Sequence, residues 1–249
     1  MNVVALAFFR GKESEYEQGA NPGGFFRGYL RSIVRAHHSV WPDWAMWFYH
    51  DNAVRDFAEF KLLERYQEAG LVKLIERGSA EPLTASMLWR LLPAWEPGVD
   101  RFLCRDIDSL PQPRERKAVE RWIASGKPIN ALHDSTSHQG TAIMGGMCGF
   151  VASYVREKFN THEIFKLAMQ ASGVDFARKG GDQHFLNQAF PYANEMLSEW
   201  VDPESGPWDL DRNFAEGWAR CVGGGFIATH VPAWFDKRYP NPRIIACES

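Results

Sequence analysis

Short apolar runs alternate along this chain with segments in which apolar residues recur every three or four positions. A run of four to eight apolar residues is typical of a buried strand, and the wider spacing is typical of an amphipathic helix. Strands are predicted at residues 2–9, 43–49, 71–75, 99–104, 128–132, 142–150 and 225–231. Helices are predicted at residues 25–37, 54–69, 83–94, 113–125, 162–171 and 182–190. This alternation predicts an α/β fold, with a mostly parallel central sheet covered by helices on both faces.

Two carboxylates follow the fourth predicted strand, in the segment VDRFLCRDIDS at residues 99–109. In an extended chain, residues two apart point to the same side, at about 3.3 Å of rise per residue. Asp106 and Asp108 can therefore bracket one hard divalent cation, which in turn can bind a diphosphate. A second pair, Asp209 and Asp211, has no apolar run before it and is typical of a turn. The first pair is therefore the predicted metal site.

Other polar residues follow the first two predicted strands. Phe9 and Arg10 end the first strand, and Asp51 follows the second. Ligands of open α/β sheets bind at the carboxyl ends of the strands. We therefore expect Arg10, Asp51 and Asp106 to converge on one edge of the sheet, which is a stronger indication of a site than any single motif.

Composition and charge narrow the classes of function. The 249 residues are 45% hydrophobic and carry a net charge of −3, which indicates a folded domain and argues against a nucleic-acid binder. The start, MNVVALAFFRG, has no basic segment before its apolar run, and no stretch approaches the ~20 apolar residues of a membrane span. The four cysteines lack metal-ligand spacing. We expect a cytoplasmic, reduced protein of one domain over residues 1–249, with a nucleotide-binding half at 1–110 and an acceptor half at 111–249.

The order of four short segments resembles a known family. WRLLPA, FLCRDIDS, IMGGMCGF and GGDQHFLNQ follow one another as in the metal-dependent glycosyltransferases of the GT-A fold, and are most similar to the retaining group that includes glycogenin and the lipopolysaccharide galactosyltransferases. The block RDIDSLPQPRERKAVERWIASG is similar to one in small bacterial and phage-encoded glycosyltransferases. The resemblance covers residues 83–191. It implies a single GT-A domain with a Rossmann-like sheet and a bound Mn²⁺ or Mg²⁺.

The resemblance also implies a set of metal ligands. Asp106 and Asp108 match the pair that holds the ion against the donor diphosphate. The family takes a third ligand from a C-terminal His in an HxxGxxKPW-like stretch. Here the similar segment is THVPAWF, which departs from that pattern and makes His230 the candidate.

Residues that face the donor sugar follow from the same resemblance. Arg90 matches an arginine that reaches the donor sugar or phosphate, a task that suits its planar, permanently charged fork. Gly145 and Gly146 match a small, close-approach segment beside the sugar. Asp182 and Gln183 match the pair that lines the reacting face of the sugar, and they are the candidate catalytic residues.

The expected activity is transfer of a sugar from a nucleoside-diphosphate sugar, with UDP favoured by the resemblance, to the hydroxyl of a glycan or other acceptor, with retention. Arg10 and Arg105 would add positive charge near the phosphates, and Asp134 lies in a polar loop, HDSTSH, that could contact a substrate. One alternative is an inverting transferase with Asp134 or Asp182 as the base. Another is a non-catalytic protein of the same fold that binds nucleotide sugars or carbohydrates.

Overall fold

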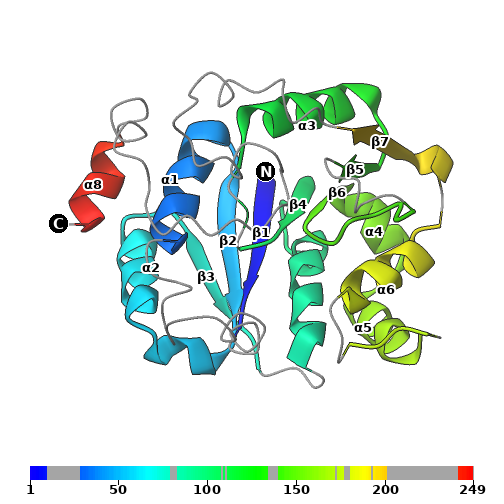
Figure 1. The fold of residues 1–249 in the computed structure, drawn as a ribbon, viewed down its shortest axis with the longest axis horizontal. Coiled ribbons are helices and arrows are strands. Elements are labelled where there is room, and N and C mark those ends of the chain that lie inside the picture. The colour runs from blue at the N-terminus through cyan, green and yellow to red at the C-terminus, as the bar shows by residue number, and fades with distance from the viewer. Residues whose placement is uncertain are drawn as a thin grey trace.

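The computed structural model of the chain describes residues 1–9, 29–78, 83–107, 109, 111–133, 140–171, 173–176, 180–191, 193–200 and 241–248. Within them the chain folds around one sheet (Figure 1). Its strands are β1 (Asn2–Phe8), β2 (Ala45–His50), β3 (Lys73–Glu76), β4 (Arg101–Arg105), β5 (Ile129–His133), β6 (Met147–Val151) and β7 (Met196–Trp200).

The sheet is mostly parallel, as predicted. Its strand order is β3-β2-β1-β4-β6-β5-β7. Strand β1 pairs in parallel with β2 and β4, β2 with β3, and β5 with β7, whereas β6 runs antiparallel to both β4 and β5. Because β6 alone is reversed among the described strands, its first residue lies beside the last residue of β4.

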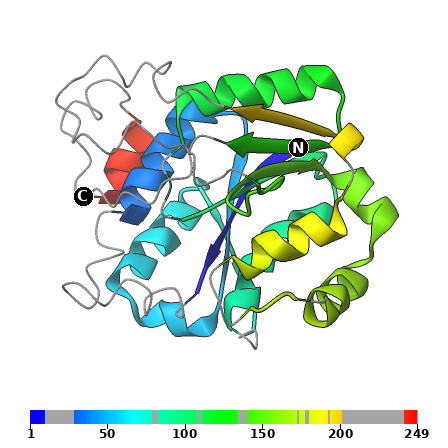
Figure 2. The same cartoon turned by 45° about the vertical axis from the view of Figure 1, so that its right-hand side comes forward.

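Helices cover both faces of the sheet, each over its own apolar core. The helical elements are α1 (Tyr29–Val40), η2 (Asn52–Asp56), α2 (Ala58–Glu68), η3 (Leu83–Trp95), α3 (Pro113–Ser125), α4 (Ala152–Lys158), α5 (Thr161–Gln170), α6 (Gly181–Ala189), η5 (Ala193–Glu195) and α8 (Pro242–Glu248). On one face the core contains residues of α1, α2, α3 and α8; on the other it contains residues of η3, α4, α5 and α6. Figure 2 shows α3 lying along β7 at one edge of the sheet.

Several predicted boundaries are wrong. The helix predicted at 54–69 is a 3₁₀ turn, η2, followed by α2, because Phe57 between them is extended at φ −76° and ψ 137°. The strand predicted at 142–150 begins only at Met147, because a turn precedes it in which the N–H of Met147 bonds the carbonyl of Met144. The helix predicted at 83–94 is confirmed in its extent by η3 (Leu83–Trp95), which is of the 3₁₀ type.

The edge strand β7 was missed, because its residues Met196–Trp200 include a serine and a glutamate that break the apolar run. The strand predicted at 225–231 lies outside the described residues.

Candidate active site

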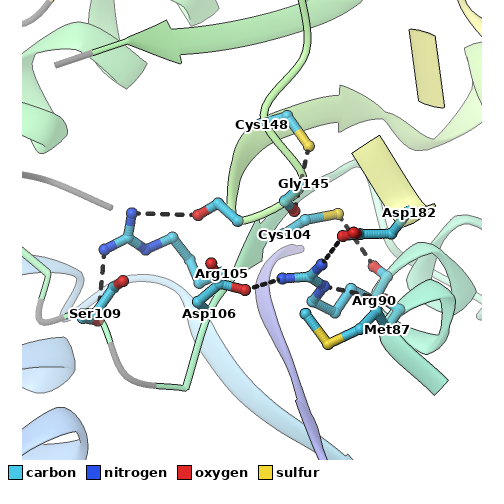
Figure 3. Close-up of polar contacts among 10 residues, drawn as sticks. Met87, Arg90, Cys104, Arg105, Asp106, Ser109, Gly145, Cys148 and Asp182 are labelled. Carbon is cyan, nitrogen blue, oxygen red and sulfur yellow. Dashed lines mark hydrogen bonds and ion pairs between the residues drawn. The ribbon is translucent and has the colours of Figure 1, made fainter. Parts of the chain in front are cut away.

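A buried arginine lies between two carboxylates that come from distant parts of the chain (Figure 3). Arg90 of η3 donates through Nη1 to Oδ1 of Asp106 at 2.5 Å, and through Nη2 to Oδ2 of Asp182 at 2.6 Å. Its Nε donates to the backbone carbonyl of Met87 at 3.0 Å. The Arg90 side chain is 2% exposed, that of Asp182 11% and that of Asp106 26%. The cluster is therefore open to solvent mainly at Asp106.

The two carboxylates of this cluster stabilise the positive charge of Arg90. Burial by itself would lower the pKa of Arg90, but the carboxylates of Asp106 and Asp182 outweigh it, so the net result is a raised pKa. Arg90 thus stays protonated at any physiological pH. One positive and two negative groups leave a formal charge of −1, which suits the binding of a cation or of a sugar that becomes positive.

The reversal of β6 brings two glycines against these carboxylates. Arg105 at the end of β4 pairs with Met147 at the start of β6, so the next residues outward are Asp106 and Gly146. A methyl group on Gly146 would lie 2.1 Å from Oδ2 of Asp106, and one on Gly145 would lie 2.1 Å from Oδ2 of Asp182. The backbone of this segment therefore touches both carboxylates.

Arg105 points to the opposite face of the sheet from Cys104, toward α3. It is 2% exposed and forms an ion pair of 3.1 Å with Glu115, which is 1% exposed. Its Nη1 and Nη2 also lie 3.4 and 3.5 Å from the carbonyls of Gly146 and Ser109. Arg105 thus links α3 to Gly146 before β6 and to Ser109, which follows Asp106.

Two thiols lie behind the cluster. Cys104 and Cys148 are directly opposite in the pairing of β4 and β6, and both are buried. The Sγ of Cys104 donates to the carbonyl of Arg90 at 3.4 Å, and that of Cys148 to the carbonyl of Gly145 at 3.8 Å. Burial, followed by the hydrogen bond with Cys104, raises the pKa of the Cys148 thiol well above its usual value.

The other residues predicted to form the site are only partly brought together. Asp51 is buried, follows β2 and accepts a hydrogen bond from the N–H of Val54 at 3.1 Å. Phe9 is buried, with its ring centroid 6.2 Å from that of Trp89. Gln183 is half-buried in the first turn of α6.

Four predicted site residues lie outside the described residues: Arg10, Asp108, Asp134 and His230. Of the expected convergence on one sheet edge, the structure therefore describes Asp51 and Asp106, which follow the parallel strands on either side of β1.

The described residues of the site include a ligand type that suits a hard divalent cation. Asp106 supplies carboxylate oxygens, the ligands that Mn²⁺ and Mg²⁺ prefer, on a side chain that is still 26% exposed. No group of three or more His, Cys, Asp or Glu side chains within the described ranges could hold an ion on its own. The remaining predicted ligands, Asp108 and His230, are not among those residues.

Sequence reasoning missed the residues that support the site from behind. Glu115, Cys104 and Cys148 were not predicted to belong to it. A glutamate at the start of a helix is normally read as a solvent-exposed contribution to capping, and a cysteine in an apolar strand as a small hydrophobe. Only the strand pairing could have indicated that Cys104 faces Cys148.

Solved structures share this arrangement of strands and helices. The glycosyltransferase GlyE of Streptococcus pneumoniae TIGR4 superposes with a TM-score of 0.51 at 13% identity, over 79% of this chain and 44% of the GlyE chain. The galactosyltransferase LgtC, solved with donor and acceptor sugar analogs, superposes with a TM-score of 0.51 at 14% identity, over 80% of this chain and 73% of LgtC. The fold is that of the GT-A glycosyltransferases.

This similarity shows the GT-A fold alone, because the identities are low and the chain spans less than half of GlyE. A 4-diphosphocytidyl-2C-methyl-D-erythritol synthase of Anaerococcus prevotii also superposes, with a TM-score of 0.47 at 11% identity, over 80% of this chain and 87% of that one. No protein-family model matches the sequence, and no curated protein does. Within the described residues, no helix is both long enough and apolar enough to cross a bilayer.

Proposed function

We propose that this chain is a metal-dependent glycosyltransferase that moves a sugar from a nucleoside-diphosphate sugar, preferably a UDP-sugar, to an acceptor hydroxyl with retention of configuration. The observation that carries the proposal is the Asp106–Arg90–Asp182 cluster in a GT-A fold, at the carboxyl end of β4. This end of a parallel strand is where α/β sheets bind their ligands.

The transfer breaks the bond between the anomeric carbon and the diphosphate oxygen, and the electron pair leaves with the diphosphate. The acceptor oxygen then bonds the anomeric carbon on the same face, and its proton passes to the departing diphosphate. The main energetic difficulty is the negative charge that develops on the leaving group. A divalent cation, when bound, supplies Lewis-acid stabilisation of that charge.

Residues of the chain itself would bind the cation, stabilise the reacting sugar and position the carboxylates. Asp106, with Asp108, would hold the cation. Asp182 and the half-buried Gln183 would line the sugar, where an anionic or carbonyl oxygen stabilises an oxocarbenium-like carbon. Arg90 holds Asp106 and Asp182 at fixed positions, since two of its nitrogens already bond them. We assign Asp182 and Gln183 as the catalytic residues on this basis.

Two alternatives lead to different outcomes in the same assays. If Asp134 or Asp182 acted as a base, the transferred sugar would have inverted configuration. If the chain only bound nucleotide sugars, donor binding would be seen without hydrolysis or transfer. Proton NMR of the anomeric signal of the first product separates retention from inversion.

The test is a thermal-shift screen of UDP, GDP, CMP and their common sugars, each with Mn²⁺ and with EDTA. A ligand at a hundredfold excess over its Kd stabilises by about 2.7 kcal/mol, which corresponds to roughly 5–10 °C in Tm for a chain of this size. We expect such a shift with one nucleoside diphosphate and Mn²⁺, and none with EDTA.

The chain provides a matched control for the metal site. Asp106→Asn should abolish the Mn²⁺-dependent shift and the release of nucleoside diphosphate from the donor, whereas Asp211→Asn, in the second Asp-x-Asp of the sequence, should leave both unchanged. Normal turnover by Asp106→Asn would overturn the proposed function.

A further inference from the structure

The backbone conformation at Gly145 and Gly146 does not require glycine. Neither has the positive φ at which glycine is favoured, unlike Gly140 or Gly180 nearby. Any residue could therefore adopt their backbone conformation. What excludes a side chain is the space beside them.

That space is filled by the two carboxylates of the site. A methyl group on Gly146 would lie 2.4 Å from Cγ of Asp106, in addition to 2.1 Å from Oδ2. A methyl group on Gly145 would lie 3.0 Å from Cγ of Asp182 and 3.3 Å from Nη2 of Arg90. Real Cβ atoms essentially never come within 3.0 Å of another heavy atom, so either methyl requires its carboxylate or the glycine backbone to shift.

The glycine segment is itself held in place. The carbonyl of Gly146 lies 3.4 Å from Nη1 of the buried Arg105, and the carbonyl of Gly145 accepts from the thiol of Cys148. The N–H of Met147 bonds the carbonyl of Met144 at 3.1 Å, which closes the turn around the pair. Because these contacts hold the backbone and a carboxylate is the free end of its side chain, we expect the carboxylates to move and relieve the clash.

We propose that Gly145 and Gly146 are separate positioning residues: Gly146 sets the carboxylate of Asp106 for the metal, and Gly145 sets that of Asp182 for the sugar. The inference rests on the proposed function and deepens it. Each glycine acts through one carboxylate, so substitution at each should impair a different property of the enzyme.

The test compares Gly146→Ala with Gly145→Ala. Binding of Mn²⁺ in the presence of UDP is measured from the loss of the free Mn²⁺ signal in electron paramagnetic resonance, and donor turnover is measured separately. We expect Gly146→Ala to weaken Mn²⁺ binding by about tenfold or more, as changes behind a metal ligand do, with turnover recovering at high Mn²⁺. We expect Gly145→Ala to keep Mn²⁺ affinity within about twofold, and to lower kcat by about tenfold to a hundredfold at every Mn²⁺ concentration.

Two further glycines serve as controls. Gly78→Ala adds a methyl group with no atom within 4 Å and should change nothing. Gly149→Ala, in β6, adds one 2.6 Å from a side-chain carbon of Leu103, in the core and away from both carboxylates. It should lower the Tm while the folded fraction keeps its Mn²⁺ affinity. A merely structural role of the glycine pair would give this second pattern at Gly145 and Gly146 as well.

The outcomes separate the inference from the function on which it rests. Wild-type protein that binds no Mn²⁺ with UDP, and turns over no donor, would overturn the proposed function and the inference with it. If the wild-type protein is active, two results would overturn the inference alone. One is normal Mn²⁺ binding by Gly146→Ala, and the other is loss of the same property to the same extent in both variants.

Discussion

Arg90 and Asp182 lie 92 positions apart in the sequence, yet they form an ion pair of 2.6 Å in the interior of the protein. One comes from η3 and the other from the first turn of α6, and the two elements share the apolar core on one face of the sheet. The pair therefore exists only when these elements are packed together, and its loss should be felt in both stability and activity.

Removal of Arg90 should be strongly destabilising. In Arg90→Met, Asp106 and Asp182 would lose the positive charge that Arg90 places between them, and loss of one partner of a buried pair costs about 3–5 kcal/mol. We expect a loss of that size in the free energy of unfolding, measured by urea denaturation. Arg116→Met is the matched control, because Arg116 pairs with exposed Asp43 and Glu120, and it should cost about 1 kcal/mol or less. Equal losses in the two variants would contradict the buried role of Arg90.

The Arg105–Glu115 pair should behave as a buried unit. Glu115→Ala takes from the buried guanidinium of Arg105 the carboxylate that lies 3.1 Å from it, and should lower the free energy of unfolding by about 3–5 kcal/mol. The double variant Arg105→Met/Glu115→Leu removes both charges and should regain most of that loss. A double-mutant cycle measures the coupling between the two residues. Purely additive losses would mean that the two side chains do not interact.

The two opposed thiols should be inert in the folded protein. Because burial and the hydrogen bond with Cys104 raise the pKa of Cys148, little thiolate is available to attack a reagent. In a Cys221→Ser/Cys247→Ser background, we expect Cys104 and Cys148 to react with a thiol reagent only after addition of urea. Between pH 7 and pH 9, the rate of labelling at Cys148 in the folded protein should rise far less than that of free cysteine. Rapid labelling of the folded protein would contradict this.

Buried His37 should make the fold sensitive to acid. Burial, reinforced by neighbouring His38, lowers the pKa of His37 to about 3, and its Nε2 lies 2.9 Å from the carbonyl of Trp44. The unfolded chain binds a proton near pH 6.5, so stability is present above that pH and is lost as pH falls toward 3. This group alone should remove about 2 kcal/mol between pH 7 and pH 5.

The measurement is urea denaturation at both pH values for wild-type protein and His37→Gln. The variant keeps a neutral hydrogen-bonding side chain and should show a pH dependence smaller by about 2 kcal/mol. His184→Gln, at an exposed position of α6, is the matched control for a histidine outside the core. An unchanged slope in His37→Gln would assign the acid sensitivity to other groups.

The local spacing of apolar residues was enough to predict most of the strands and helices. Strands β1, β2 and β4 are apolar runs that the sheet buries, and each begins and ends within two residues of its predicted bounds. Pattern failed where a strand is short and lies at an edge, as in β7, or where a turn interrupts an apolar segment, as at Gly145–Gly146. In both cases the structure depends on pairing with a partner strand, which local sequence does not record.

The sequence by itself determined the α/β class of the fold and the placement of Asp106 at the end of a buried strand, because hydrophobic spacing and strand ends are local properties of the chain. Only the tertiary structure decided that β6 runs antiparallel to β4, which brings Gly146 against Asp106 and Cys148 opposite Cys104. It also decided that Arg90 joins Asp106 to Asp182, and that Arg105 turns away toward Glu115. These contacts depend on strand direction and on which face of the sheet each helix covers, and both are set by packing of the whole core.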